Sequence, residues 1–421
     1  MQVFNNEYFG YKNNELFCEG VSVKNIIEET GTPAYIYSKK YFTNRYKELK
    51  DAFSGVNNTL FFATKSNFNL NVIKTFKDLG SGIDVNSAGE LYRALKAGFT
   101  PDRIIMSGVG KTDEELKLAL ENNILMIKTE SLEEIHVIDE IAGSMNKTAS
   151  IAVRVNPDVD AKTHPYISTG LAENKFGISS AEVLNVFTEA AKLKNIKVCG
   201  LDMHIGSQIV IVDPFKEAVE KLAKMFYELK AHGINIEHFD IGGGIGVTYK
   251  DEKPFLVKEL ADAILPTIKE LGIDLFYEPG RFLTANAGIL AARVLYTKKN
   301  GNKNFIIVDT AMTDLLRPSI YGSYHHIQPV VLEDGRNDII ADVVGPVCES
   351  GDFLAKKREI SECKRGDYLA VMSAGAYGMV MTSNYNMRRR PPEIIVDGDK
   401  YFVARSRETF EHILFDEKII L

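Results

Sequence analysis

The sequence predicts an α/β protein in which a (β/α)8 barrel of the TIM type precedes a mostly antiparallel β-sandwich or β-barrel domain. Two observations support this class. Eight short apolar segments alternate with helix-patterned stretches up to about residue 282, and strand patterns then follow one another with few long helices between them. A chain of 421 residues also exceeds what a single ordinary core accommodates, which fits a barrel with an added domain.

The eight apolar segments are the predicted barrel strands. They are Thr59–Thr64, Gly82–Val85, Arg103–Ser107, Ile124–Lys128, Ser150–Val155, Val198–His204, His238–Ile241 and Asp274–Tyr277. Stretches between them, such as Ala88–Gly98 and Thr112–Asn122, carry apolar residues at helical spacing. Thr112 followed by Glu115, and Asp213 followed by Pro214, are typical of helix starts. Strands alternating with helices form a parallel sheet, and eight units favour closure into a barrel over the alternative, an open doubly wound sheet.

Beyond Arg281 the pattern changes to consecutive strands. They are Asn304–Asp309, Pro329–Leu332, Ile339–Val344, Tyr368–Met372 and Ile394–Arg405. The last one contains Asp397-Gly398, a hairpin turn signal. Residues 1–30 also look strand-like, so we expect them to join this β domain. The predicted domains are therefore 1–30, 31–282 and 283–421.

Composition excludes several classes of function. A formal net charge of −7 disfavours a nucleic-acid binder, which needs a basic face. No apolar run reaches the roughly 18 residues of a membrane span, and the first residues lack the pattern of a signal peptide. The four cysteines are scattered without CxxC spacing, so we expect neither disulfides nor a metal site, and a cytoplasmic location.

Polar residues gather where the predicted barrel strands end, which is the active-site face of such barrels. They are Lys65, Asp84, Arg154, Asn156, His204, Ser207, the glycine-rich run 242–246, Glu278 and Arg281. Lys65 ends an apolar strand, where we expect desolvation to lower the pKa of its amine, as Schiff-base formation needs. In isolation it is better interpreted as a surface lysine that ends a strand, and only the neighbouring groups favour a Schiff base.

The other groups complete a possible cofactor site. A glycine run after a strand lets backbone amides approach a phosphate, although it is also an ordinary tight turn. Glu278 can protonate a pyridine nitrogen and Arg281 can hold a substrate carboxylate, unless the two pair with each other. His204 alone is better interpreted as a buried core histidine. Together, an amine, phosphate-binding amides and an acid predict pyridoxal phosphate.

The motifs of the first domain resemble a known family. Its segments are Phe62-Ala63-Thr64-Lys65-Ser66-Asn67, His204-Ile205-Gly206-Ser207-Gln208, the run 242–246 and Glu278-Pro279-Gly280-Arg281. They resemble the alanine-racemase-like barrel class of pyridoxal-phosphate decarboxylases, and within it the diaminopimelate decarboxylase family, nearly from end to end. The resemblance implies that Lys65 is the Schiff-base lysine and that His204 stacks on the cofactor ring. It further implies cofactor contacts from Ser207, Gly243, Gly244, Glu278, Pro279, Gly280 and Arg281.

The second domain carries the matching substrate motifs. Leu316–Tyr321 is similar to the segment that supplies a substrate-binding arginine and tyrosine, here Arg317 and Tyr321. Gly345–Ser350 resembles a loop that reaches into the partner subunit's site, which implies Cys348 as proton donor and Glu349 as the group that holds the distal ammonium. Tyr377, in Ala376-Tyr377-Gly378, would contact cofactor and substrate. The resemblance therefore implies a homodimer with shared active sites.

Departures from the family pattern are mild: Ser66 replaces the commoner alanine, Ile320 a leucine and Arg389 a proline. We interpret the run Arg388–Arg390 as a solvated basic loop. The resemblance implies decarboxylation of meso-diaminopimelate to L-lysine and carbon dioxide, the last step of lysine biosynthesis. A decarboxylase of another basic amino acid, such as D-ornithine or carboxynorspermidine, and a non-catalytic homologue are the alternatives. The charges of Arg281, Arg317 and Glu349 favour diaminopimelate, which has a carboxylate and an ammonium at each end.

Overall fold

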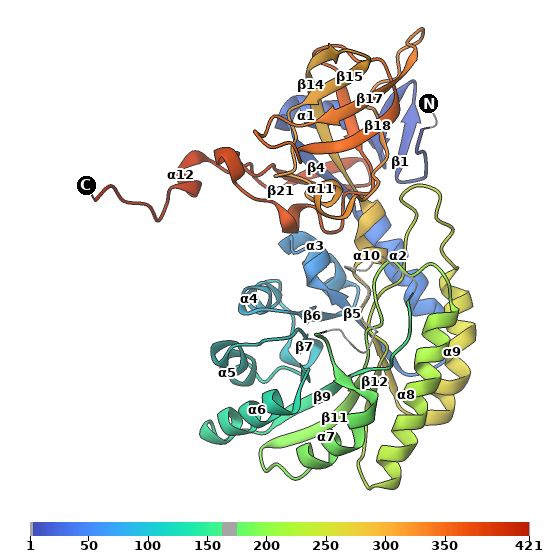
Figure 1. Ribbon diagram of the computed structural model, residues 1–421, viewed down its shortest axis with the longest axis vertical. Coiled ribbons are helices and arrows are strands. Elements are labelled where there is room, and N and C mark those ends of the chain that lie inside the picture. Colours follow the sequence, from blue (N-terminus) through green and yellow to red (C-terminus); the bar gives the residue numbers. More distant parts are fainter. Residues whose placement is uncertain (1–2, 162–174, 421) are drawn as a thin grey trace. The chain divides into compact units, whose positions relative to one another are not determined.

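The computed structural model describes residues 3–161 and 175–420. The chain forms two compact units (Figure 1). One, the barrel unit, comprises Asn44–Thr248 and Glu252–Phe282; the other, the β unit, comprises Met1–Thr43, Tyr249–Asp251 and Leu283–Leu421.

The barrel unit closes as predicted. Its strands are β5 (Asn58–Ala63), β6 (Gly82–Val85), β7 (Ile104–Met106), β8 (Met126–Thr129), β9 (Ala149–Asn156), β11 (Ile196–Asp202), β12 (His238–Asp240) and β13 (Asp274–Tyr277). Each pairs in parallel with the next, β13 pairs with β5 and β8 pairs with β9, so the ring is complete. The barrel is therefore confirmed and the open sheet is excluded. The short β10 (Ile178–Ser179) pairs with Val155 and Asn156 at the C-terminal end of β9.

Helices surround this ring of strands (Figure 1). They are α2 (Lys39–Ala52), α3 (Leu70–Asp78), α4 (Ala88–Lys96), α5 (Asp113–Glu121), α6 (Leu132–Ser144), α7 (Val183–Ala190), α8 (Asp213–Ala231) and α9 (Val257–Leu271), and the short α10 (Arg281–Thr284) follows β13. The predicted start of α5 is confirmed, because Thr112 and Glu115 form a capping box. The α8 start at Asp213, with Pro214 in the first turn, is confirmed as well.

The barrel interior has an apolar layer beneath a charged one. Phe61, Ile105, Met126, Ala152, Cys199 and Phe276 come from six strands and pack together. Side chains two residues apart on a regular strand point to the same face, so the residue two positions further along also faces inward. β11 departs from this rule because its register shifts between Val198 and Gly200. From Met126 this rule leads to Lys128, from Ala152 to Arg154 and from Phe276 to Glu278. The inward-facing side chains therefore change from apolar to charged toward the C-terminal ends of the strands. We call this polar end of the barrel the barrel mouth.

The β unit is a mostly antiparallel sheet system. Its strands are β4 (Ala34–Ser38), β14 (Gly288–Asn300), β15 (Lys303–Val308), β16 (Ile327–Pro329), β17 (Asp338–Val344), β18 (Phe353–Ser361), β19 (Tyr368–Val371), β20 (Glu393–Asp397) and β21 (Lys400–Arg405). Only the pairs β15–β17 and β20–β4 within this set are parallel. The Asp397-Gly398 hairpin between β20 and β21 is as predicted. The short helices α11 (Arg317–Tyr321) and α12 (Phe410–Ile413) complete the unit.

The N-terminal segment joins the β unit as predicted, but the part that joins it extends beyond residue 30. It forms β1 (Phe9–Lys12), β2 (Glu15–Cys18), β3 (Val21–Ser22) and the unpredicted helix α1 (Val23–Thr30). The predicted boundary at residue 30 is too early, because β4 pairs with both β14 and β20. The division falls instead after Thr43, inside α2. Within the described part of the chain, no helix combines the length and apolarity that a membrane crossing requires.

Candidate active site

Lys65 lies in the short 3-10 turn Thr64–Ser66, directly after β5. Lys65 is therefore no longer part of the strand, and it is exposed to solvent. Our expectation that burial desolvates this amine is therefore wrong. Ser66 is buried, and its hydroxyl donates to the carbonyl of Ala63 at 2.8 Å. The serine that replaces the commoner alanine is thus accommodated by a local hydrogen bond.

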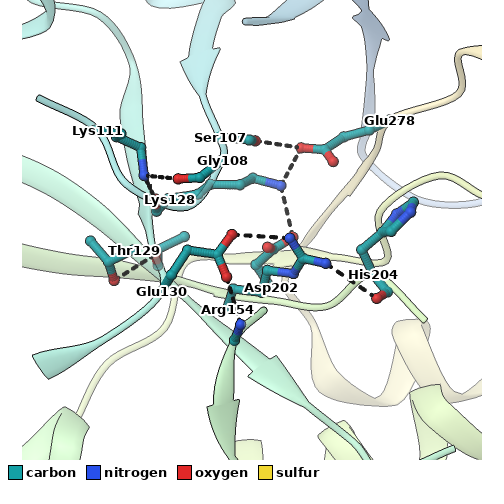
Figure 2. A network of polar contacts seen from close by, with 12 residues as sticks. Ser107, Gly108, Lys111, Lys128, Thr129, Glu130, Arg154, Asp202, His204 and Glu278 are labelled. Carbon is teal, nitrogen blue, oxygen red and sulfur yellow. Dashed lines mark hydrogen bonds and ion pairs between the residues drawn. The ribbon is translucent and has the colours of Figure 1, made fainter. Parts of the chain in front are cut away.

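The centre of the barrel mouth is an ion cluster around Lys128 (Figure 2). This lysine is 1% exposed, and its ammonium bonds to Asp202 Oδ1 at 2.7 Å and to Asp240 Oδ2 at 2.5 Å. A third ion pair joins it to Oε1 of Glu278. These three carboxyl groups lie close enough together to ligate a metal ion. In this protein the lysine ammonium supplies the positive charge among them.

Burial and charge shift the acid–base properties of this cluster. Burial by itself would lower the pKa of Lys128, but the surrounding carboxylates raise it well above its ordinary value. Burial raises the pKa of Asp202, and raises that of Asp240 still more strongly with help from the charge of Glu278. Lys128 therefore stays charged, while Asp202 and Asp240 hold protons more readily than acids in water.

Asp84, at the end of β6, is a further buried acid of the mouth. It is fully buried, and neither carboxyl oxygen meets a hydrogen-bond donor among the described residues. Burial and the charge of Glu278 raise its pKa to about 7, against the opposing charges of Lys65 and Lys128. Lys65 is thus close enough to act electrostatically on the buried acids of the mouth.

Glu278 is held by one of its two oxygens. Oε1 accepts from Lys128 and, at 3.5 Å, from the hydroxyl of Ser107. No described residue donates to Oε2. Arg281 does not pair with Glu278, which excludes that simpler interpretation; its Nη2 and Nε donate instead to Ser207 Oγ at 3.0 and 3.3 Å. Pro279 and Gly280 join the two residues, and Gly280 packs tightly on Ser66.

His204 follows β11 and presents a neutral imidazole. Its Nδ1 accepts a hydrogen bond from the backbone N–H of Gly243 at 3.1 Å. Burial and the nearby charges of Lys65 and Arg154 lower its pKa well below the ordinary value. Arg154 is in turn fixed by Glu130 at 3.0 Å (Figure 2). The histidine is therefore an uncharged ring attached to the glycine-rich turn.

The glycine-rich turn after β12 packs directly against its neighbours. A Cβ on Gly243 would lie 2.2 Å from the carbonyl oxygen of Glu278, and one on Gly244 would lie 2.4 Å from that of Gly206. Gly244 also has a φ of +108°, which favours glycine. The N–H groups of Gly244 and Ile245 donate to no acceptor among the described residues. Two free amides in a glycine turn suit a phosphate.

In the β unit, Arg317 begins α11 and is buried. Its Nη1 lies 3.1 Å from Nε2 of His325, and its guanidinium covers the ring of Tyr249 at 4.7 Å. His325 Nδ1 lies 2.9 Å from the carbonyl oxygen of Met372, so Nδ1 carries the proton and Nε2 accepts from the arginine. Tyr321, at the other end of α11, is half-buried.

The loop Gly345–Ser350 is organised by a buried acid that sequence analysis did not identify. Asp352 accepts from the backbone N–H groups of Val347 and Met312, each at 2.7 Å. Cys348 and Glu349 are both exposed, and the Cys348 N–H donates to Asn386 Oδ1 at 2.9 Å. The loop backbone is thus fixed while its reactive side chains face outward.

Two further predictions fall in the β unit. Tyr377 adopts a left-handed backbone with φ +54° and is half-buried. The run Arg388–Arg390 is not a solvated loop: Arg388 donates to the carbonyl of Asp309 at 2.7 Å, and Arg390 pairs with Glu408 at 2.9 Å. Only Arg389 is exposed, because its two neighbours turn inward to acceptors of the unit.

The barrel mouth fits pyridoxal phosphate. The free amides of Gly244 and Ile245 suit its phosphate, and the free Oε2 of Glu278 suits its ring nitrogen. His204 supplies an uncharged aromatic ring, and Lys65 supplies the amine.

Sequence reasoning missed the group that joins these parts. Lys128, Asp202 and Asp240 were placed in strands but given no role. The signal was available, because a lysine or aspartate within an otherwise apolar barrel strand needs a buried partner.

Comparisons with known proteins agree with this geometry. Residues 39–285 match the family described as pyridoxal-dependent decarboxylase, pyridoxal binding domain. The diaminopimelate decarboxylase of Aquifex aeolicus is 47% identical over 97% of each chain, and that of Haemophilus influenzae is 46% identical over 96% of this chain and 98% of its own. The solved structure of a diaminopimelate decarboxylase from M. jannaschii in co-complex with L-lysine is similar with a TM-score of 0.94, at 34% identity over 99% of each chain.

Proposed function

The chain belongs to the pyridoxal-dependent decarboxylases, among the diaminopimelate decarboxylases, and we propose that it converts meso-diaminopimelate to L-lysine and carbon dioxide, the last step of lysine biosynthesis. The observation that carries this proposal is the barrel mouth. There a lysine amine, two free backbone amides and a carboxylate with a free oxygen meet the needs of pyridoxal phosphate.

Each barrel residue then has a role toward the cofactor. Lys65 Nζ attaches it covalently, and the amides of Gly244 and Ile245, with Ser207, bind its phosphate. The N–H of Gly243 instead holds His204 beside the phosphate turn. Glu278 accepts a hydrogen bond from the protonated ring nitrogen, and His204 covers a ring face. When bound, pyridoxal phosphate draws electrons away from the bond to the leaving carboxylate. Because that ring charge must be maintained, a carboxylate at the nitrogen is the appropriate partner.

Arg281 of the barrel unit and several residues of the β unit give selectivity for the substrate. Arg281 and Arg317 hold its carboxylates, with Tyr321 and Tyr377 as further contacts. Glu349 holds the distal ammonium. A site with this charge pattern rejects amino acids that lack the distal carboxylate, because its buried polar groups would then lose their partners. The buried, doubly constrained Arg317 suits such a role.

Cys348 delivers the proton that replaces the departing carboxylate. Its exposed thiol on a backbone fixed by Asp352 and Asn386 is accessible to a substrate and held in one region of space. A cysteine thiol is one of the side chains that can act as a general acid.

The exposed position of Cys348 and Glu349 is the reason to propose a homodimer with shared active sites. Apolar side chains at the C-terminal end support a partner surface: Phe415 is 83% and Ile420 86% exposed. The free cysteines, Cys18, Cys199, Cys348 and Cys363, fit a cytoplasmic location. Mixing inactive Lys65→Ala and Cys348→Ala proteins should restore activity, because a hybrid dimer regains one intact site. A monomer with full activity would contradict the shared site.

The substrate assignment is tested directly. Purified protein supplied with pyridoxal phosphate is incubated with meso-diaminopimelate, and carbon dioxide and L-lysine are measured. L-lysine, L-ornithine and D-ornithine serve as parallel substrates. Turnover of diaminopimelate alone supports the proposal; preference for another amino acid would leave the cofactor site intact but refute the assigned substrate pocket.

A further inference from the structure

The ammonium of Lys128 has no donor left for any further task. A lysine ammonium carries three N–H bonds. In this protein they go to Asp202, Asp240 and Glu278, and the lysine is 1% exposed. An amine whose three protons are all engaged, and whose pKa is raised, does not act as a base. Its effect must therefore be exerted through its three partners.

Of those partners, Glu278 has the most exposed side chain, and its Oε2 accepts from no described residue. Asp202 and Asp240 are fully buried side chains of β11 and β12. Asp240 also accepts the N–H of Gly242 through its other oxygen at 2.7 Å. Glu278 gives Oε1 to Lys128 and Ser107, and Figure 2 shows its second oxygen turned away from both. The carboxyl group is thus oriented from one side only.

We propose that Lys128 is a positioning residue: by holding Oε1 of Glu278 it presents the second oxygen, Oε2, to the ring nitrogen of the cofactor. This inference rests on the proposed function. Lys128 itself does not touch the cofactor or the substrate. It acts from the inner side of the barrel, one layer beneath the reacting groups.

The charge balance of the mouth explains why a cation is needed there. The carboxyl oxygens of Asp202, Asp240 and Glu278 lie within 4.8 Å of one another. Buried carboxylates at such distances repel one another and relieve the repulsion by sharing protons. Lys128 reduces this repulsion by supplying one positive charge to all three.

The test separates positioning from general stability by changing the ligand as well as the protein. Dissociation constants are measured for pyridoxal phosphate and for its deaza analogue, in which a C–H replaces the ring nitrogen. In Lys128→Met we expect affinity for pyridoxal phosphate to fall roughly 10- to 100-fold, the size typical of groups that orient a ligand-binding residue. Affinity for the analogue should change less than about threefold, because Glu278 makes no bond to its C–H.

Lys111 offers a matched control. It is another buried lysine of the barrel unit, paired with Glu134 at 2.9 Å with side chains 3% and 13% exposed. Lys111→Met removes a comparable ion pair that does not involve the three acids. Because Lys111 also donates to the backbone carbonyl of Lys128, this variant tests whether disturbing the Lys128 backbone is enough to reproduce the effect. We expect it to lower the melting temperature and to leave the ratio of the two dissociation constants unchanged.

The remaining outcomes are also decisive. If Lys128→Met fails to fold, the variant Lys128→Met/Asp202→Asn/Asp240→Asn removes the excess negative charge and retains Glu278; the same ratio is then measured in it. An equal loss of both ligands, or no loss of either, would overturn the positioning role. If the wild-type protein attaches no pyridoxal phosphate at Lys65, the proposed function itself fails; if it does, only the role of Lys128 is refuted.

Discussion

The barrel mouth and the loop Gly345–Ser350 fix their polar groups in opposite ways. In the mouth, the ends of strands carry buried side chains that are bonded to one another, as Lys128 is to Asp202 and Asp240. In the loop, only the backbone is bonded, by the buried Asp352, and the side chains of Cys348 and Glu349 are exposed. The difference teaches that the side chains of the mouth are organised before any ligand binds, whereas the side chains of Cys348 and Glu349 make no hydrogen bond to another described residue.

The largest effect should come from the barrel side. In Lys65→Ala we expect the visible absorbance of the covalently attached cofactor to disappear and the rate of carbon dioxide release to fall at least about a thousandfold, because the attaching amine is lost. Absorbance and carbon dioxide release measure the two effects separately. Persistence of the absorbance band would show that another amine attaches the cofactor.

The loop side should behave differently. In Cys348→Ala we expect kcat to fall about 10²- to 10⁴-fold, the range of a lost general acid, while the absorbance of the bound cofactor is unchanged. Steady-state kinetics and the absorbance spectrum check this. Cys363→Ala is the control, because this half-buried cysteine of the β unit has no proposed role. Loss of cofactor from Cys348→Ala would contradict the division of roles in which the barrel mouth binds the cofactor and the loop Gly345–Ser350 donates the proton.

The buried side chains of Arg317 and His325 in the β unit contact each other, as those of the barrel mouth do. A substitution of His325 tests whether this contact orients Arg317. His325→Phe removes the acceptor at 3.1 Å from the guanidinium while keeping a ring in the buried position. We expect KM for diaminopimelate to rise about tenfold with a smaller change in kcat, since a substrate-holding arginine loses its orientation. Kinetics with the substrate varied decide this. An unchanged KM would mean that α11 alone fixes Arg317.

The smallest effect concerns Asp84 and depends on pH. Its folded-state pKa of about 7 lies above the ordinary value, so the native state binds its proton more tightly than the unfolded state. Stability from this group is therefore lost as pH rises toward and beyond the folded pKa. Asp84→Asn should raise the melting temperature more at about pH 8 than at about pH 5. A gain that is equal at both pH values would show that Asp84 does not titrate in this window.

The spacing of apolar residues predicted a strand correctly where the strand is buried along nearly its whole length. β6 and β13 were placed at their observed bounds, since each is a short apolar run between turns. The strands β14 and β18 were missed, because their exposed parts carry charged residues such as Lys356, Lys357 and Arg358. The pairing of β4 with the β unit was missed because it joins segments about 250 residues apart, which no local pattern contains.

Individual residues of the candidate site could be predicted from the sequence, but the ion pairs and hydrogen bonds between them could not. Lys65, His204 and Glu278 stand out because they follow strands. That Glu278 pairs with Lys128, 150 residues away, depends on the closure of the barrel and on the face to which each strand turns. The interpretation of Arg388–Arg390 failed for the same reason, since the acceptors Asp309 and Glu408 are remote in sequence.

The ion cluster also has a consequence for folding. β8 and β9 form one of the pairs that complete the barrel, with Lys128 opposite Ala152. A slip of one residue along this pair would turn the lysine to the outer face and leave the acids of β11 and β12 facing each other without a cation. The misregistered ring would thus carry an uncompensated buried charge, whereas a slip among purely apolar side chains would be tolerated more easily. The cluster therefore acts as an electrostatic check on strand register during assembly of the barrel.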